Sequence, residues 1–276
     1  MNKKDLLMHA TSFLESLPDN TISAELAISK KVVGLKIYDA PILAIGNSQD
    51  PYFRLFKDET IIGNHFILPE EWLPEAQTVI SFFLPYTNDV RAGNKTAPFW
   101  PAEEWLHARV EGQTVVTKMG QHLQAELAKA GYQSVIPTLD PRFQIRRSTD
   151  PGEQPFASNW SERHVALVCG LGTFGLSKGL ITARGMAGRL GSLVTNLPLT
   201  ADERPYSEIY EYCTQCGACV KQCPVAAISI ETGKNHLRCS DFLDETAEKF
   251  KPRYGCGKCQ VNVPCESRIP LSPASN

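Results

Sequence analysis

The sequence predicts a layered α/β domain over residues 1–200, followed by a small cysteine-rich α+β domain over residues 201–276. Two observations predict this division. Residues 1–212 contain a single cysteine, Cys169, whereas residues 213–276 contain eight. Strand and helix patterns alternate in the first part, which is typical of helices packed on a sheet. The polar segment Ala201–Pro205 precedes the change in composition and is suited to a joint between domains.

The composition limits the location and the partners of the chain. Of its 276 residues, 21% are charged, and the net charge of −2 comes without an extended run of Lys or Arg. This balance argues against general affinity for nucleic acid or for an anionic membrane. No apolar run approaches the roughly 18–20 residues that span a bilayer. We therefore expect a cytoplasmic protein whose reduced cysteines bind metal rather than form disulfides.

Two elements are predicted near the start of the chain. An amphipathic helix is expected to end before Pro18, because one helical face carries four apolar residues, Leu6, Ala10, Phe13 and Leu17. Residues 78–84 are almost entirely apolar and precede Pro85, which predicts a buried strand.

A long helix, two strands and a loop are predicted in the rest of the first part. The helix has apolar residues with helical spacing over 116–130 and ends at Gly131. Residues 134–136 and 190–197 predict strands, each followed by a proline. Residues 138–163 are rich in Asp, Pro, Arg and Ser without periodicity, which predicts a long loop.

The strongest motif begins at Cys213. Residues 213–224 have the spacing C-x2-C-x2-C-x3-C-P, the run of the bacterial ferredoxins. In this run three thiolates hold one iron–sulfur cube, and the fourth ligates a second cube. Four more cysteines complete both sets. The crossed pairing predicts one [4Fe–4S] cluster on Cys213, Cys216, Cys219 and Cys265, and a second on Cys223, Cys239, Cys256 and Cys259.

A zinc ribbon is the alternative for these cysteines. It would use Cys213, Cys216, Cys256 and Cys259 and would leave four cysteines without a role as ligands. Cys169 ends an apolar stretch and is expected to be a small buried hydrophobic residue.

A glycine-rich segment precedes the cysteine run. Gly170, Gly172 and Gly175 match G-x-G-x-x-G, which alone is a weak sign of dinucleotide binding. The acidic residue expected about 20 positions later for a ribose is missing, since the first acid is Asp202. A tight turn near the domain interface is the alternative. A NAD-linked oxidoreductase is therefore the third-ranked functional hypothesis.

Three stretches in this order resemble the epoxyqueuosine reductase family, which is related to the reductive dehalogenases. They are residues 161–175, residues 191–199 and the ferredoxin run, and the resemblance covers about residues 155–265. It implies a reductase in which two [4Fe–4S] clusters feed electrons to a base-off cobalamin over the α/β domain. The glycine segment, with Thr173, would lie beside that corrinoid. No D-x-H-x-x-G motif is present, which agrees with the base-off form.

Further site residues precede the glycine segment. Arg142, Arg146 and Arg147 are predicted to clamp the phosphate of the cofactor's nucleotide tail, and a solvated loop face is the alternative. Glu162 and His164 are predicted proton donors beside the redox centre. An ordinary salt bridge on a helix surface is the alternative for these two.

The sequence departs from the family at the position of a catalytic acid. The family has an Asp six residues before the Glu matched by Glu162, where this chain has Phe156. This departure and the net charge argue against tRNA as a partner.

The leading hypothesis is an iron–sulfur reductase that passes electrons from a donor such as ferredoxin or flavodoxin to a corrinoid or a small-molecule substrate. The alternative is a cluster-only electron-transfer or corrinoid-reducing partner protein, without small-molecule turnover of its own.

Overall fold

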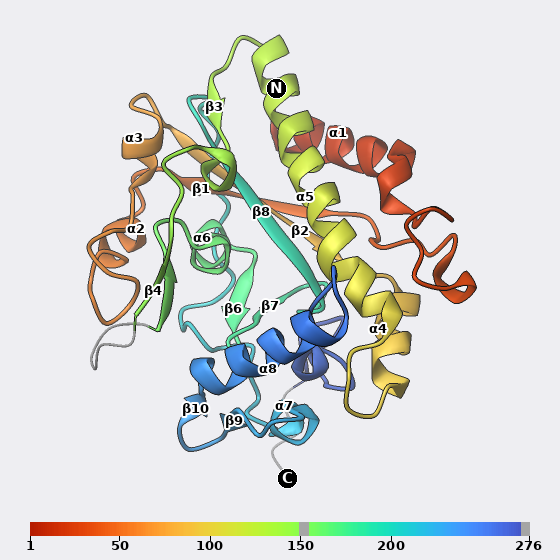
Figure 1. Cartoon of the computed structure of the whole chain (residues 1–276). Coiled ribbons are helices and arrows are strands. Elements are labelled where there is room, and N and C mark those ends of the chain that lie inside the picture. Colours follow the sequence, from red (N-terminus) through yellow and green to blue (C-terminus); the bar gives the residue numbers. More distant parts are fainter. Residues whose placement is uncertain (149–154, 272–276) are drawn as a thin grey trace.

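The computed structural model describes residues 1–148 and 155–271 (Figure 1). The helices are α1 (Lys3–Ser16), α2 (Pro51–Leu55), α3 (Pro69–Trp72), α4 (Asn88–Thr96), α5 (Glu103–Lys129), α6 (Glu162–Cys169), α7 (Ala218–Gln222) and α8 (His236–Lys249). The strands are β1 (Ile42–Asn47), β2 (Thr78–Pro85), β3 (Ser134–Val135), β4 (Ile145–Arg147), β5 (Phe156–Ser158), β6 (Gly172–Phe174), β7 (Leu180–Thr182), β8 (Gly188–Thr195), β9 (Ile228–Ser229) and β10 (Gly233–Lys234).

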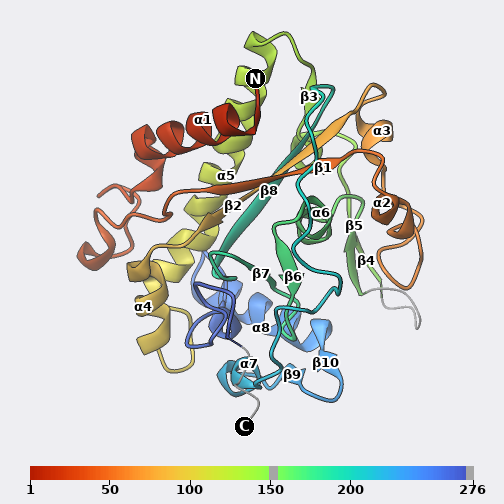
Figure 2. The ribbon, with the colours of Figure 1, turned by 180° about the vertical axis from the view of Figure 1, so that it is seen from behind.

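The main sheet has the strand order β1-β2-β8-β3, and all of its pairs are antiparallel. Alternate side chains of β2 point to opposite faces. Ile80, Phe82 and Leu84 join a core cluster with α1 and α5, whereas Val79 and Phe83 join a second cluster with α6. Figures 1 and 2 show these helices on opposite sides of the sheet. The mixed α/β class is thus confirmed, as three layers around an antiparallel sheet.

The elements predicted from periodicity are present. The apolar run at 78–84 is β2, which is buried along its whole length, and the later strands are β3 and β8. The N-terminal helix buries Leu6, Ala10 and Leu14. The long helix starts earlier than its periodic stretch and has 27 residues. Cys169 is completely buried, as expected.

The long loop predicted over residues 138–163 needs correction. Strands β4 and β5 pair antiparallel within it, with Ile145 opposite Ser158, and α6 begins at Glu162. Residues 149–154 of this segment lie outside the described residues. Short strands of three residues gave too little periodicity to predict a hairpin.

The cysteine-rich part packs against one end of the sheet, where α7, α8 and the β9–β10 hairpin lie below β6 and β7 in Figure 1. Several contacts cross the proposed boundary at residue 200. Arg253 forms an ion pair with Glu111 of α5, and the amide of Asn94 in α4 donates to the backbone oxygen of Cys256 at 2.9 Å. The cysteine segments are therefore held by the helices and hairpin of the first part.

Within residues 1–148 and 155–271, no helix has the length and apolar character needed to cross a membrane.

Candidate iron–sulfur centre

The eight cysteines after residue 212 lie near one another, and their interactions agree with a division into two sets of four. The thiol of Cys265 interacts electrostatically with those of Cys213, Cys216 and Cys219. The thiol of Cys256 interacts in the same way with the three remaining members of the other set, Cys223, Cys239 and Cys259. These are the two sets that the ferredoxin spacing pairs. We call them the first thiol set and the second thiol set.

The two thiol sets are neighbours. The thiols of Cys219 and Cys259 interact with each other across them. Cys219 is the third cysteine of the ferredoxin run, and Cys223 follows it one helical turn later at the end of α7. The short helix therefore carries the chain from one set to the other.

A hollow that is partly open to solvent lies inside the first thiol set, and all four of its cysteines line it. The turn of the β6–β7 hairpin closes one side, where the backbone N–H of Leu176 donates to Sγ of Cys213 at 3.4 Å. The hairpin also holds the start of the run, because Oγ1 of Thr173 accepts from the Tyr212 N–H at 2.9 Å. Cys216 is the exposed member of the set. The first set thus lies between the hairpin and the protein surface.

Cationic side chains interact with members of the second thiol set. Lys258 is only 3% exposed, and its Nζ donates to the backbone oxygens of Asn94 at 2.8 Å and of Ala97 at 2.5 Å. This ammonium interacts with the Cys256 thiol, and Lys234 interacts with Cys259.

Arg163 also belongs to this environment, since it interacts with the thiols of Cys239 and Cys259. Sequence reasoning did not single out Lys258. Lys258 lies between the two cysteines of a C-x2-C pair, and this position could have indicated a residue close to the cluster.

The donor chemistry of the thiol sets suits iron–sulfur cubes, and the sulfurs are not gathered as tightly as in a zinc site. Within the described part of the chain, no three cysteine sulfurs lie within 4.8 Å of one another. A tetrahedral zinc site with Zn–S bonds of about 2.3 Å requires sulfurs only about 3.8 Å apart. In the second set, the N–H of Ala227 donates to Sγ of Cys223 at 3.1 Å, a contact of the kind that tunes cluster potentials.

Burial keeps several of these thiols protonated in the absence of iron. It raises the pKa of Cys219 to about 11 and the pKa values of Cys256 and Cys265 to about 12. Only the thiolate is a metal ligand, so cluster assembly must displace these protons.

Glu162 is a half-buried acid at the start of α6, and both of its carboxylate oxygens are inaccessible to solvent. Among the described residues, neither carboxylate oxygen has a well-formed hydrogen bond. Burial raises the pKa of Glu162 to about 7, although the hydroxyl of Ser192 opposes the shift. A carboxyl group with this pKa can release and regain a proton near neutral pH.

His164 differs from Glu162 in its protonation. Burial is the main cause that lowers the pKa of His164 to about 3, and the charge of Arg163 adds to it. Its Nδ1 lies 2.8 Å from Oγ of Ser161. The ring is therefore neutral at pH 7, and its role as a proton donor stays a prediction.

The glycine-rich segment is explained by its own packing. Gly170 ends α6 with a φ of +95°, in the left-handed region that glycine adopts easily. A Cβ on Gly172 would lie 1.9 Å from the backbone oxygen of Ile181 in β7. Thr173 is fully buried, and a Cβ on Gly175 would pack against Ile181. This packing favours the alternative of a tight turn near the domain interface over dinucleotide binding, and the position of these glycines beside a corrinoid stays a prediction.

The arginines of the predicted phosphate clamp do not act as one group. The guanidinium of Arg142 binds Asp140 at 2.8 Å and donates to two backbone carbonyls at the end of α3. Arg147 is exposed and lies over the ring of Phe156, and Arg146 is exposed beside it in β4. Arg142 is therefore part of the local structure, which corrects its predicted role as a phosphate ligand.

Comparisons with known proteins agree with this arrangement. Residues 206–229 match the model of the 4Fe-4S binding domain. The epoxyqueuosine reductase of Staphylococcus aureus is 26% identical over 207 residues, which are 71% of this chain and 50% of the relative.

Solved structures share the fold. A crystal structure of epoxyqueuosine reductase has a TM-score of 0.55 and 17% identity, covering 98% of this chain and 66% of the other. A catabolic reductive dehalogenase has a TM-score of 0.53 and 14% identity, covering 83% of this chain and 30% of the other.

These matches cover a larger share of this chain than of its relatives. The chain spans about half the length of the Staphylococcus aureus relative. The sequence match extends well beyond the cysteine run, and the shared fold covers nearly the whole chain. The chain is a distant homologue of the epoxyqueuosine reductases and carries a 4Fe-4S binding domain.

Proposed function

We propose that this chain is an iron–sulfur reductase that relays electrons through two [4Fe–4S] clusters to an acceptor in its α/β part. Residues 201–276 would form the cluster domain and residues 1–200 the acceptor domain. The two adjoining sets of four thiols carry the proposal, because eight such ligands match two cubes. The homologues named above are reductases, which supports the same class of reaction.

The charges around the thiol sets support a direction for electron flow. Reduction adds a negative charge to a cluster, so nearby cations raise its reduction potential. Lys258, Lys234 and Arg163 interact with the second set. Electrons would therefore arrive at the first cluster, near the exposed Cys216, and move to the second. A ferredoxin or flavodoxin is the proposed donor.

Glu162 is the proposed proton source for the reduction. Its pKa of about 7 lets it supply a proton at neutral pH and regain one from solvent. Its neighbour in sequence, Arg163, interacts with thiols of the second set. Proton supply and electron supply would thus be close together at the start of α6.

Base-off cobalamin is the acceptor that the family resemblance implies. It would supply a cobalt centre reducible by the clusters. Two of the residues predicted to cradle it make other contacts, because Gly172 packs against Ile181 and Arg142 is bound to Asp140. We therefore assign no step to a corrinoid, and direct reduction of a substrate by the second cluster is the simpler form of the proposal.

A cluster-only electron-transfer protein is the second candidate. One observation favours it. Apart from the hollow of the first thiol set, a hollow lies at Tyr52, Val168 and Tyr206. This hollow is partly open to solvent, whereas a typical small-molecule site buries most of the ligand surface.

The proposal predicts the metal content of the protein. Chain purified or reconstituted without oxygen should contain about eight iron and eight sulfide ions. Iron, sulfide and zinc would be measured on the same sample. Zinc in place of iron, or only about four iron after full reconstitution, would contradict the two-cluster assignment. Adding cobalamin to this sample, desalting it and recording the spectrum tests separately for a retained corrinoid.

The proposal also predicts poor reduction of epoxyqueuosine in tRNA. An acid is needed where negative charge develops on the opening epoxide oxygen, and the corresponding position is Phe156, in β5. The gene should fail to restore queuosine in a bacterial strain that lacks its own reductase, while a complete epoxyqueuosine reductase restores it. Restoration at the normal rate would overturn this prediction.

A further inference from the structure

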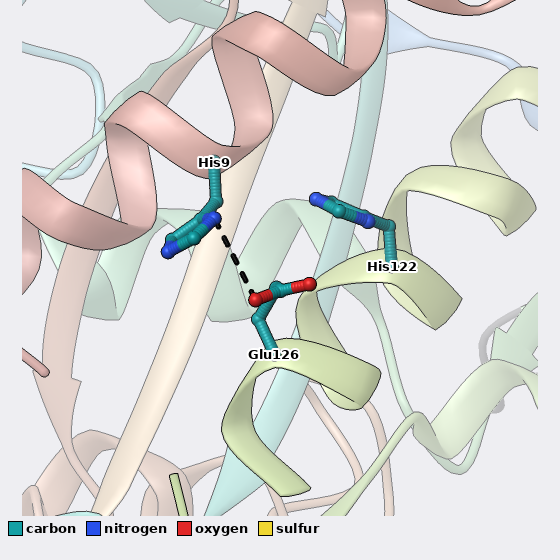
Figure 3. A group of neighbouring side chains, drawn as sticks. All are labelled: His9, His122 and Glu126. Carbon is teal, nitrogen blue, oxygen red and sulfur yellow. Dashed lines mark ion pairs between the residues drawn. The ribbon is translucent and has the colours of Figure 1, made fainter. Parts of the chain in front are cut away.

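Three side chains with metal-binding atoms meet between α1 and α5, on elements separate from the cysteine run. They are His9 from α1 and His122 and Glu126 from α5, and one ligand atom from each lies within 4.8 Å of the other two. Figure 3 shows the two rings and the carboxylate around a shared space between the helices. The proposed iron–sulfur function does not use any of them.

The helices fix the geometry of this group. His122 and Glu126 are four residues apart on α5, so they lie on the same face one turn apart. Nδ1 of His9 lies 3.7 Å from a carboxylate oxygen, Oε2, of Glu126. The ring of His122 stacks on Phe13 of α1, with ring centres 4.2 Å apart and an angle of 5° between the planes. This stacking limits the rotation of the imidazole.

An ordinary ion pair does not account for all three side chains. The other carboxylate oxygen of Glu126, Oε1, already binds Nζ of Lys129 at 2.7 Å. His122 adds a second imidazole where one would suffice for an ion pair. Two imidazoles and one carboxylate are a donor set of zinc sites.

We propose that His9, His122 and Glu126 bind one Zn²⁺ ion, with water as the fourth ligand, and that the ion ties α1 to α5. Tetrahedral coordination with bonds of about 2.0–2.2 Å places ligand atoms about 3.4 Å apart. The pair His9 and Glu126 is already close to that separation. The ligand atoms, which lie within 4.8 Å of one another, need to approach by at most about 1.4 Å, which small changes in the side-chain torsion angles of His9 and Glu126 can supply.

Zinc uptake by the cluster-loaded protein tests the site. Iron–sulfur clusters occupy the cysteines, any histidine tag is removed, and loosely bound metal is stripped with a chelator. Dialysis against micromolar Zn²⁺ should then load about one zinc ion per chain. His9→Ala and Glu126→Gln should each lose most of this zinc. Gln121→Ala, an exposed substitution on the same helix, is the matched control and should keep it.

Hydrogen exchange supplies a second measurement. Zinc should slow amide exchange in Lys3–Ser16 of the wild type and of Gln121→Ala, but not of His9→Ala, because only the first two can tie α1 to α5. Iron content, measured in parallel, shows whether zinc has displaced clusters instead. Equal zinc uptake by the wild type and His9→Ala, at unchanged iron content, would overturn the proposal. His9 is part-exposed on α1, so its replacement leaves the core of the helix intact.

Discussion

Cys223→Ala is expected to destroy the same iron–sulfur cluster as Cys239→Ala and to spare the cluster that Cys213→Ala removes. The reason is the crossed arrangement of the thiols. Cys223 follows Cys219 by only four residues, yet it interacts with Cys256 and belongs to the second thiol set. Each variant should therefore fall from about eight iron ions to about four.

Electron paramagnetic resonance of the reduced variants distinguishes the two clusters. The spectra of Cys223→Ala and Cys239→Ala should match each other, and the spectrum of Cys213→Ala should be complementary to both. Cys169→Ala is the matched control, because this cysteine is completely buried beside Val79 and belongs to neither set. It should keep both signals. Loss of the Cys213 cluster in Cys223→Ala would show that the pairing is wrong.

The cysteine sets could be predicted because their information is local. The spacing from Cys213 to Cys223 fixes which thiols face one cube and which one leaves for the next. Strand β2 could be predicted for the same reason, because its apolar run over 78–84 lies within one segment, and the strand is buried on both faces. Patterns confined to one segment, of this length and strength, identify an element without knowledge of its neighbours.

The corrected roles depend on contacts between distant segments. The guanidinium of Arg142 binds backbone carbonyls 70 and 71 residues earlier in the chain, which its sequence neighbours do not reveal. Gly172 is required by Ile181 on the opposite strand of a hairpin too short to show a pattern. Lys258 is buried because α4 ends where its ammonium can reach two carbonyls. The sequence pointed to Arg142 and Gly172 but could not decide between their alternative roles, and it gave no direct indication that Lys258 is buried.

The stability of Glu162→Gln relative to the wild type is expected to be greater at pH 8 than at pH 5. Burial raises the pKa of Glu162 from 4.5 to about 7, so the folded state favours the protonated acid. Below pH 4.5 the acid is protonated in both the folded and the unfolded state, so it does not lower the free energy of unfolding. As the pH rises from 4.5 to 7, the loss in free energy of unfolding grows, and it reaches its full value above pH 7.

The size of the effect follows from the shift. A difference of about 2.5 pKa units corresponds to about 3 kcal/mol of lost stability above pH 7. Between pH 5 and pH 8 the cost changes by about 2.5 kcal/mol, which is about 5–10 °C in melting temperature for a chain near this size. Glutamine cannot ionise, so the variant lacks this pH dependence. Any penalty of the buried amide is the same at both pH values and cancels in the comparison.

Melting curves of the cluster-loaded wild type and Glu162→Gln, recorded without oxygen at pH 5, 6, 7 and 8, measure the effect. Glu75→Gln replaces an exposed glutamate with the same amide and is the matched control. The difference in melting temperature between Glu162→Gln and the wild type should move in favour of the variant as the pH rises, while the control stays parallel to the wild type. A difference that does not change with pH would mean that Glu162 is already ionised at pH 5, and it would remove this residue as the proton source of the proposed reduction.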